Sequence, residues 1–233
     1  MTISESSTNP YSTPSISTVD RIIKILFFGL FIKPIVLIVM GLNVRFREKL
    51  PLTGPAIIVA NHNSHLDTMV LMSLYPLSKI HKIRPVAAAD YFLESGGFMA
   101  WLSLKCIGII PLDRTGTTNR EELFEGCHKA LDNGDVLILF PEGSRGNPEQ
   151  MSTLKKGVFF IARDRTDTEI TPVIMHGLGR ALPKGEALFV PFNCDVVIGD
   201  SIRPTEKSFD FINNISSSFD DLSQYCITRA HDS

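Results

Sequence analysis

Residues 56–60 read Ala56-Ile57-Ile58-Val59-Ala60, a short run of small and β-branched apolar side chains. A continuous apolar run of this length is typical of a strand that is buried on both faces, as in a parallel sheet. Similar runs recur at 85–88, 107–110, 136–140, 170–175 and 195–198. Helical patterning separates them, as at 121–131, where we expect Gly134 to end the helix. The alternation predicts an α/β fold with a central, mostly parallel sheet flanked by helices.

Two polar motifs directly follow two of these runs. The first reads Asn-His-Asn-Ser-His-Leu-Asp at 61–67, and the second reads Phe-Pro-Glu-Gly-Ser-Arg at 140–145. In open α/β sheets, ligands bind just beyond the carboxyl ends of the strands. We therefore expect the two motifs to lie close together and to form one site.

Composition excludes several classes of function. The chain has 233 residues, of which 44% are hydrophobic, so it is long enough to bury the core of one domain with a modest extension. Its formal net charge of −2 provides no basic field, which argues against a nucleic-acid partner. The four cysteines are widely separated and lack the spacing of a zinc site, so we expect them to be reduced structural thiols.

The N-terminal part divides into two segments, and residues 45–233 are left for the α/β domain. Residues 1–20 are rich in Ser, Thr and Pro, a composition that predicts a disordered head. Residues 21–44 are strongly apolar but are interrupted by Lys24, Lys33 and Pro34, whereas a spanning helix needs about twenty uninterrupted apolar residues.

This apolar segment predicts an N-terminal helical membrane anchor that lies in the plane of the membrane or re-enters it. We expect Pro34 to divide it into two short helices, with Lys24 and Lys33 reaching toward the lipid headgroups. Basic residues lie on both sides of the segment, so the charge asymmetry that orients a spanning helix is missing and we expect both ends in the cytoplasm. Arg45, Arg47 and Lys49 would face lipid phosphates. A buried pair of core helices and a single tilted spanning helix are alternatives.

His62 and Asp67 form a candidate general base with its orienting partner. Five residues separate them, a spacing that would point them apart on one helix, so His62 must precede the helix. Ser64 is a candidate N-cap with Asp67 at the third helical position, from which the carboxylate could fix the imidazole tautomer. The alternatives are a helix cap with an incidental histidine, or a metal site with His65, for which the sequence offers no further ligand cluster.

The second motif has the chemistry of a phosphate site. Gly143 allows close approach of the backbone, Ser144 adds a hydroxyl, and Arg145 can bind a phosphate bidentately. A surface turn with an ion pair between Glu142 and Arg145 is the alternative. Arg114, at the end of the segment 108–114, is a second candidate for the same phosphate, although it could simply pair with Asp113.

Taken in this order, the motifs resemble those of the glycerolipid acyltransferases, a family that includes bacterial 1-acylglycerol-3-phosphate acyltransferase. The resemblance covers residues 43–199 and the motifs N-H-x-S-x-x-D, G-x-x-x-x-x-R, F-P-E-G-[ST]-R and a variant of V-P-V at 171–173. It implies that His62 is the general base and Asp67 its partner. It also implies that the phosphate and glycerol of the acceptor are bound by Arg114, Glu142, Gly143, Ser144 and Arg145, and that the acyl or acceptor pocket is lined by Thr171, Pro172 and Val173.

The resemblance implies a membrane-associated O-acyltransferase on the cytoplasmic face of the inner membrane. It would move an acyl chain from acyl-CoA or an acyl carrier protein thioester to a lysophospholipid, most simply lysophosphatidate, giving phosphatidate. No cofactor beyond the thioester and no metal is implied, and the partners would be the two substrates, the membrane surface and acyl carrier protein. Another lysolipid such as a lyso-ornithine lipid as acceptor, a non-catalytic module that binds anionic lipids, and a thioester hydrolase are the alternatives.

Overall fold

The computed structural model describes residues 17–39, 41–64, 66–90, 97–113, 119–144, 150–163, 165, 168–178 and 193–228. Within them, β2, β3, β4, β5 and β6 run parallel, whereas β7 pairs antiparallel with β6 and parallel with β1. The sheet is therefore mostly parallel, as predicted. Its seven strands lie in the order β1 (Gly41–Arg45), β7 (Asn193–Ile198), β6 (Glu169–His176), β2 (Ala56–Ala60), β5 (Val136–Leu139), β3 (Ile83–Ala88) and β4 (Ile110–Leu112).

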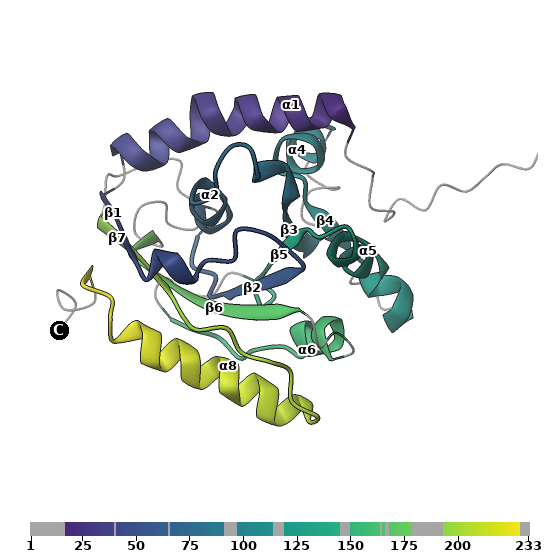
Figure 1. Ribbon diagram of the computed structural model, residues 1–233, viewed down its shortest axis with the longest axis vertical. Helices are drawn as coiled ribbons and strands as arrows, with labels where there is room; N and C mark the ends of the chain where they lie inside the picture. The colour runs from purple at the N-terminus through teal and green to yellow at the C-terminus, as the bar shows by residue number, and fades with distance from the viewer. Residues whose placement is uncertain are drawn as a thin grey trace, which may run out of the picture.

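Helices cover both faces of the sheet (Figure 1). One face carries α1 (Thr18–Phe27), α2 (Leu66–Ser73) and α4 (Gly97–Trp101), and the other carries α5 (Arg120–Asp132), α6 (Gly157–Ala162) and α8 (Ser208–Ser223). On β2, Ala56, Ile58 and Ala60 pack into the core under α1 and α2, while Ile57 and Val59 pack toward α5, α6 and α8. Burial on both faces explains why this strand is apolar at every position.

Glycines in the left-handed conformation end two helical segments. Gly134 has φ +69°, and the N–H groups of Gly134 and Asp135 donate to the carbonyls of Leu131 and Ala130 at 2.9 and 3.0 Å, so the predicted end of α5 is confirmed. Gly108 has φ +77° and ends a π-helical segment at 102–107. The strand predicted at 107–110 is therefore wrong in its range, because β4 begins only at Ile110.

The N-terminal segment is helical and packs on the domain. Residues 1–16 of the predicted head lie outside the described residues, and α1 begins at Thr18 with a reciprocal capping box between Ser17 and Asp20. The helical backbone continues past Pro34, with π-helical turns at 28–32 and 35–39, so the prediction of two separate helices is wrong. Such turns tolerate the missing proline N–H. Among the described residues, no helix is both long and apolar enough to cross a bilayer.

Lys24 anchors α1 to the sheet. Its side chain is 1% exposed, and its Nζ donates to the carbonyl of Ile83 at 2.7 Å. Burial lowers the pKa of Lys24 well below its ordinary value, and the nearby Arg84 acts in the same direction. The prediction that Lys24 reaches the lipid headgroups is therefore wrong.

The basic residues around the apolar segment also have partners within the protein. Arg45 donates to the carbonyl of Tyr225, Arg47 donates to the carbonyl of Leu74, and Lys49 pairs with Asp200 at 2.8 Å. These contacts do not support the expectation that basic residues beside the anchor face lipid phosphates.

Candidate active site

The turn after β2 is fixed by asparagine side chains. The amide group of Asn61 donates to the carbonyl of Met175 at 2.8 Å and accepts from its N–H at 2.7 Å, so it continues the pairing of β2 with β6 beyond the end of the strand. Asn63 donates to the same carbonyl at 3.0 Å. These bonds hold His62 at the carboxyl edge of the sheet. Sequence reasoning assigned no task to Asn61, although an amide side chain directly after a buried strand was the available signal.

His62 and Asp67 are in the contact that the sequence predicted. His62 Nδ1 lies 2.9 Å from Asp67 Oδ2, and their side chains are 19% and 0% exposed, respectively. Asp67 Oδ2 also accepts the N–H groups of Asn63 and Ser64 at 2.6 and 2.8 Å, while the Ser64 hydroxyl accepts the N–H of Leu66 at 3.3 Å. The start of α2 is thus capped as expected, and the carboxylate is held rigidly beside the imidazole.

The imidazole is oriented from two sides. Burial raises the pKa of Asp67, while the hydrogen bonds from His62 and from the two main-chain N–H groups act in the opposite direction. On its face, the His62 ring stacks on Phe140 with a centroid distance of 4.2 Å and an interplanar angle of 21°. Donation from Nδ1 to the carboxylate fixes the tautomer in which Nε2 carries the lone pair, so Nε2 has the orientation of a base.

Glu142 joins the two motifs. Its side chain is buried, and Oε1 accepts the main-chain N–H of His62 at 2.7 Å. Oε2 accepts both the N–H and the hydroxyl of Ser152 at 2.8 Å. In the structure Glu142 thus positions the main chain of His62, a task that the sequence did not reveal. Its implied contact with the acceptor stays a prediction.

The remaining predicted phosphate-binding residues fall into two groups. Gly143 and Ser144 lie in the turn next to Glu142, and the Gly143 N–H donates to the carbonyl of Phe140 at 3.0 Å with a φ of +75°. Arg114 and Arg145 lie outside the described residues, as does His65.

The predicted pocket residues lie within β6, before its carboxyl end. Thr171 and Val173 pair with Ile58 and Ala60 of β2, and both are almost completely buried. Met175, two positions further along β6, bonds to Asn61 and Asn63 in the turn around His62. The pocket role of Thr171, Pro172 and Val173 stays a prediction.

A cavity of about 590 Å³ lies next to the turn that carries Phe140 and Gly143, although His62 itself is not part of its lining. Phe140 lines it and also stacks on His62, so this ring connects the cavity to the candidate base. The other walls come from the ends of β3, β4 and β5 and from α5 and α6. They are largely apolar, and their charged residues are the cations Arg120, Lys155 and Lys156 and the carboxylate Asp113.

Comparison with known proteins agrees with this geometry. The model of the Acyltransferase family matches residues 41–176, which run from β1 through β6 and include both motifs. The chain belongs to the acyltransferase family. The four cysteines of this acyltransferase are free and buried, and its described residues contain no group of three or more His, Cys, Asp or Glu that could hold a metal ion.

Curated relatives of this acyltransferase carry one activity in their names. It is 28% identical over 164 residues to the chloroplastic 1-acyl-sn-glycerol-3-phosphate acyltransferase LPAT1 of Arabidopsis thaliana, covering 70% of this chain and 44% of the relative. It is 30% identical over 157 residues to 1-acyl-sn-glycerol-3-phosphate acyltransferase alpha of Mus musculus, covering 66% and 52%. The chain thus spans about half the length of these relatives.

A solved structure shares the fold of this acyltransferase. The crystal structure of the 1-acyl-sn-glycerophosphate acyltransferase PlsC from Thermotoga maritima aligns with a TM-score of 0.67 at 18% identity, covering 86% of this chain and 79% of that one. The likeness extends over more of the chain than the matched family segment does.

Proposed function

We propose that this acyltransferase moves a fatty acyl chain from an acyl-CoA or acyl carrier protein thioester to the free hydroxyl of 1-acylglycerol-3-phosphate, giving phosphatidate. The observation that carries the proposal is the contact between His62 and the buried Asp67 at the open edge of the sheet. The names of the curated relatives support the choice of acceptor. The reaction needs no group beyond the thioester itself.

In the proposed mechanism, His62 Nε2 takes the proton of the acceptor hydroxyl while the oxygen attacks the thioester carbonyl carbon. The tetrahedral intermediate then collapses, the carbon–sulfur bond breaks, and the sulfur leaves with the proton held by His62. Asp67 stabilises the imidazolium that exists between these two steps. The acceptor phosphate would be held by Arg114 and Arg145 together with the turn at Gly143 and Ser144.

Main-chain N–H groups near His62 are already engaged. The N–H of His62 donates to Glu142, and those of Asn63 and Ser64 donate to Asp67. The N–H of Gly143 donates to Phe140. In this conformation these four groups therefore support the base and its turn and do not form an oxyanion hole.

The direct test is thiol release from acyl-CoA in the presence and absence of lysophosphatidate. We expect release that depends on the acceptor, phosphatidate as product, and loss of both in His62→Ala. His128→Ala is the matched control, because His128 lies on α5 and bonds to Arg165, outside the site. Equal rates in the native protein and His62→Ala would refute the catalytic assignment, and release without acceptor would indicate a hydrolase.

We further propose that the outer face of the N-terminal helical segment rests in the plane of the membrane, with the catalytic domain on the cytoplasmic side. The inner face, with Ile25, Phe28 and Val36, packs into the core. The outer face exposes a row of large apolar side chains, which a bilayer interface would cover. Their exposed fractions range from 52% to 81% for Val19, Ile22, Leu26, Leu30, Phe31, Leu37 and Ile38.

Sedimentation with vesicles of phosphatidylglycerol and phosphatidylethanolamine tests this placement. We expect the double variant Leu30→Ser, Ile38→Ser to lose most of its vesicle binding. Phe209→Ser is the control, because Phe209 is 70% exposed on α8, on the other face of the sheet. Unchanged vesicle binding of the double variant would refute the placement. If the double variant instead converted a dimer of the native protein into a monomer, this face would be assigned to a second copy of the chain.

A further inference from the structure

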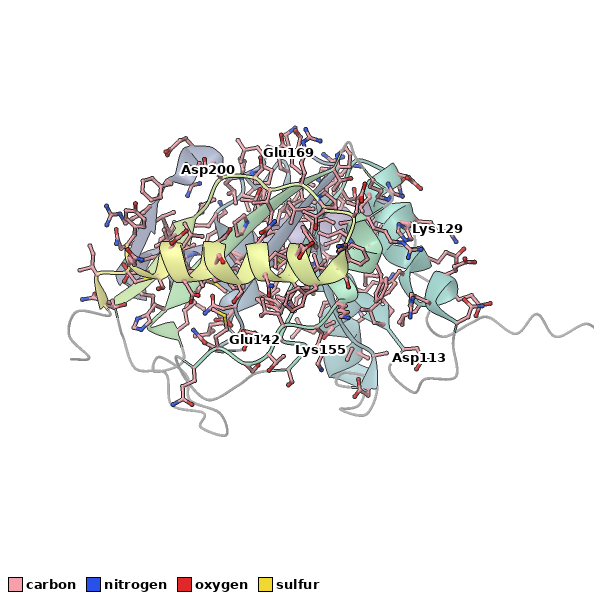
Figure 2. All side chains as sticks on the ribbon, turned by 90° about the horizontal axis from the view of Figure 1, so that it is seen from below. Asp113, Lys129, Glu142, Lys155, Glu169 and Asp200 are labelled. Carbon is pink, nitrogen blue, oxygen red and sulfur yellow. The ribbon has the colours of Figure 1, made fainter. Side chains whose placement is uncertain are left out.

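The segment at 150–156, just before α6, is bound to the turn that carries Glu142. The N–H of Lys155 donates to the carbonyl of Pro141 at 2.7 Å. The N–H and hydroxyl of Ser152 both donate to Glu142 Oε2. Figure 2 shows Glu142 and Lys155 together along one edge of the molecule, with Glu169, at the start of β6, on the opposite edge. Lys155 thus lies at the edge that carries the candidate site.

The side chain of Lys155 lies against Gly143. A Cβ atom on Gly143 would lie only 2.7 Å from Lys155 Nζ and 2.9 Å from Lys155 Cδ, so the lysine occupies the space that the glycine leaves open. Within the described residues, no carboxylate lies within 4.0 Å of this ammonium. A cation that packs along the turn next to Glu142, with no carboxylate of the described residues in ion-pair distance, is a ready site for an anionic ligand group.

The cavity beside this ammonium suits an amphiphile. The charged part of the lining consists of the cations Lys155, Lys156 and Arg120 and the carboxylate of Asp113. The Arg120 guanidinium lies 4.0 Å from the centroid of the Phe160 ring. Most of the remaining lining is apolar, including Leu112 and Phe124. A ligand with an anionic head and an apolar tail would match both parts of this cavity.

We propose that Lys155 is a further binding residue of the site, whose ammonium binds the phosphate monoester of the acceptor lysolipid across Gly143. This inference rests on the proposed function and adds to it a cation that the sequence motifs do not include. The structure also explains how the phosphate would be placed relative to the base. Glu142 bonds to the main chain of His62 with one oxygen and to the segment of Lys155 with the other, so one carboxylate sets the distance between them.

The experiment measures steady-state kinetics with lysophosphatidate and acyl-CoA varied separately. In Lys155→Gln we expect the KM for lysophosphatidate to rise by about 10- to 100-fold, the loss expected for one hydrogen bond to a charged group. The KM for acyl-CoA and kcat at saturation should change little, and Lys155→Arg should restore most of the affinity. Lys207→Gln is the matched control, because Lys207 is exposed beside α8 and lines no part of the cavity.

Coenzyme A also carries phosphates. The separate KM values for lysophosphatidate and acyl-CoA show which of the two substrates has its phosphate bound by Lys155. A rise confined to the KM for acyl-CoA would overturn the assignment to the acceptor. No change in either KM would overturn the role of Lys155 altogether. Lys155 is exposed, so its replacement by Gln should leave the melting temperature unchanged, which excludes misfolding as the cause.

A binding measurement separates this inference from the proposed reaction. Equilibrium binding of lysophosphatidate and of monoacylglycerol is measured in the His62→Ala background, where no turnover is expected. Selective binding of lysophosphatidate that Lys155→Gln abolishes would support the phosphate site even if the native protein proved inactive. Equal binding of the two lipids by an active enzyme would refute the phosphate site and leave the reaction standing.

Discussion

Replacing Asp67 with Asn should abolish most of the activity and leave the fold intact. Among the described residues, three hydrogen bonds to this carboxylate, from His62 Nδ1 and from the main chain of Asn63 and Ser64, converge on Oδ2. Oδ1 has no hydrogen-bond partner among the described residues. An asparagine whose amide oxygen takes the place of Oδ2 keeps every bond, whereas the flipped amide would face three donors. The tautomer of His62 is therefore preserved, and only the negative charge is lost.

The size of the effect follows from this charge. At an effective dielectric constant of about 20, two unit charges about 4 Å apart attract by about 4 kcal/mol, which is an upper bound for the stabilisation of the imidazolium. Loss of about 2–4 kcal/mol corresponds to a fall in kcat of about 30- to 1000-fold, at about 1.4 kcal/mol per factor of ten. For stability, the buried NH₂ without an acceptor costs about 1–3 kcal/mol. Removal of a carboxylate whose pKa is raised by burial offsets part of that loss.

The assay combines initial rates of thiol release with thermal unfolding and ¹⁵N spectra of the imidazole. We expect Asp67→Asn to unfold within a few degrees of the native protein, to keep the proton on Nδ1, and to lose activity as stated. Asp67→Ala leaves the N–H groups of Asn63 and Ser64 without their acceptor and should be clearly less stable. Near-native activity of Asp67→Asn, or a proton found on Nε2, would refute the reasoning.

Three further outcomes follow from other contacts. Glu142→Gln should lower both kcat and the melting temperature. One oxygen of Glu142 accepts the N–H of His62 and the other accepts the N–H of Ser152, so either orientation of the amide places its NH₂ group against an N–H. Initial rates and melting curves, recorded beside those of Asp67→Asn, check this. Phe140→Leu should reduce kcat about 3- to 10-fold, by loss of the ring stacking on His62, with little change in KM, as initial rates would show. Burial lowers the pKa of Lys24 in the folded protein, whereas in the unfolded chain it has the ordinary value of 10.5. Between these two pKa values the unfolded chain binds one more proton than the folded protein. The free energy of unfolding therefore rises with pH in this range, by at most about 1.4 kcal/mol per pH unit. In urea unfolding at several pH values, Lys24→Met should show a flatter dependence.

The sheet was predictable because local pattern and burial agree. The runs at 56–60, 136–140 and 170–175 are apolar at almost every position, and each is found within one residue of its expected limits. The run at 107–110 is also apolar, yet its first residue, Ile107, is the last residue of a helical segment that Gly108 caps. Periodicity alone cannot distinguish a short buried strand from the last turn of a buried helix. β1 was missed because Gly41–Arg45 borders the apolar segment that precedes it.

In the candidate site, contacts within a motif could be predicted and contacts between motifs could not. The spacing of His62 and Asp67 required a turn before a helix, and that turn is present. The bond from His62 to Glu142 spans 80 residues of sequence, and no pattern within either motif encodes it. The residues at 150–156 likewise gave no sign that the Lys155 side chain would lie against Gly143.

The N-terminal segment shows why apolar composition underdetermines the position of a helix. Its inner face is core and its outer face is exposed, and both are made of the same Leu, Ile, Val and Phe side chains. The sequence pattern therefore favoured a membrane anchor and treated Lys24 as an interruption that would reach toward water. In the structure, Lys24 marks the opposite face, because its ammonium finds the carbonyl of Ile83 beneath the helix. A buried lysine with a single main-chain acceptor fixes the rotation of α1 on the domain, and this rotation determines which apolar side chains remain for a membrane to cover.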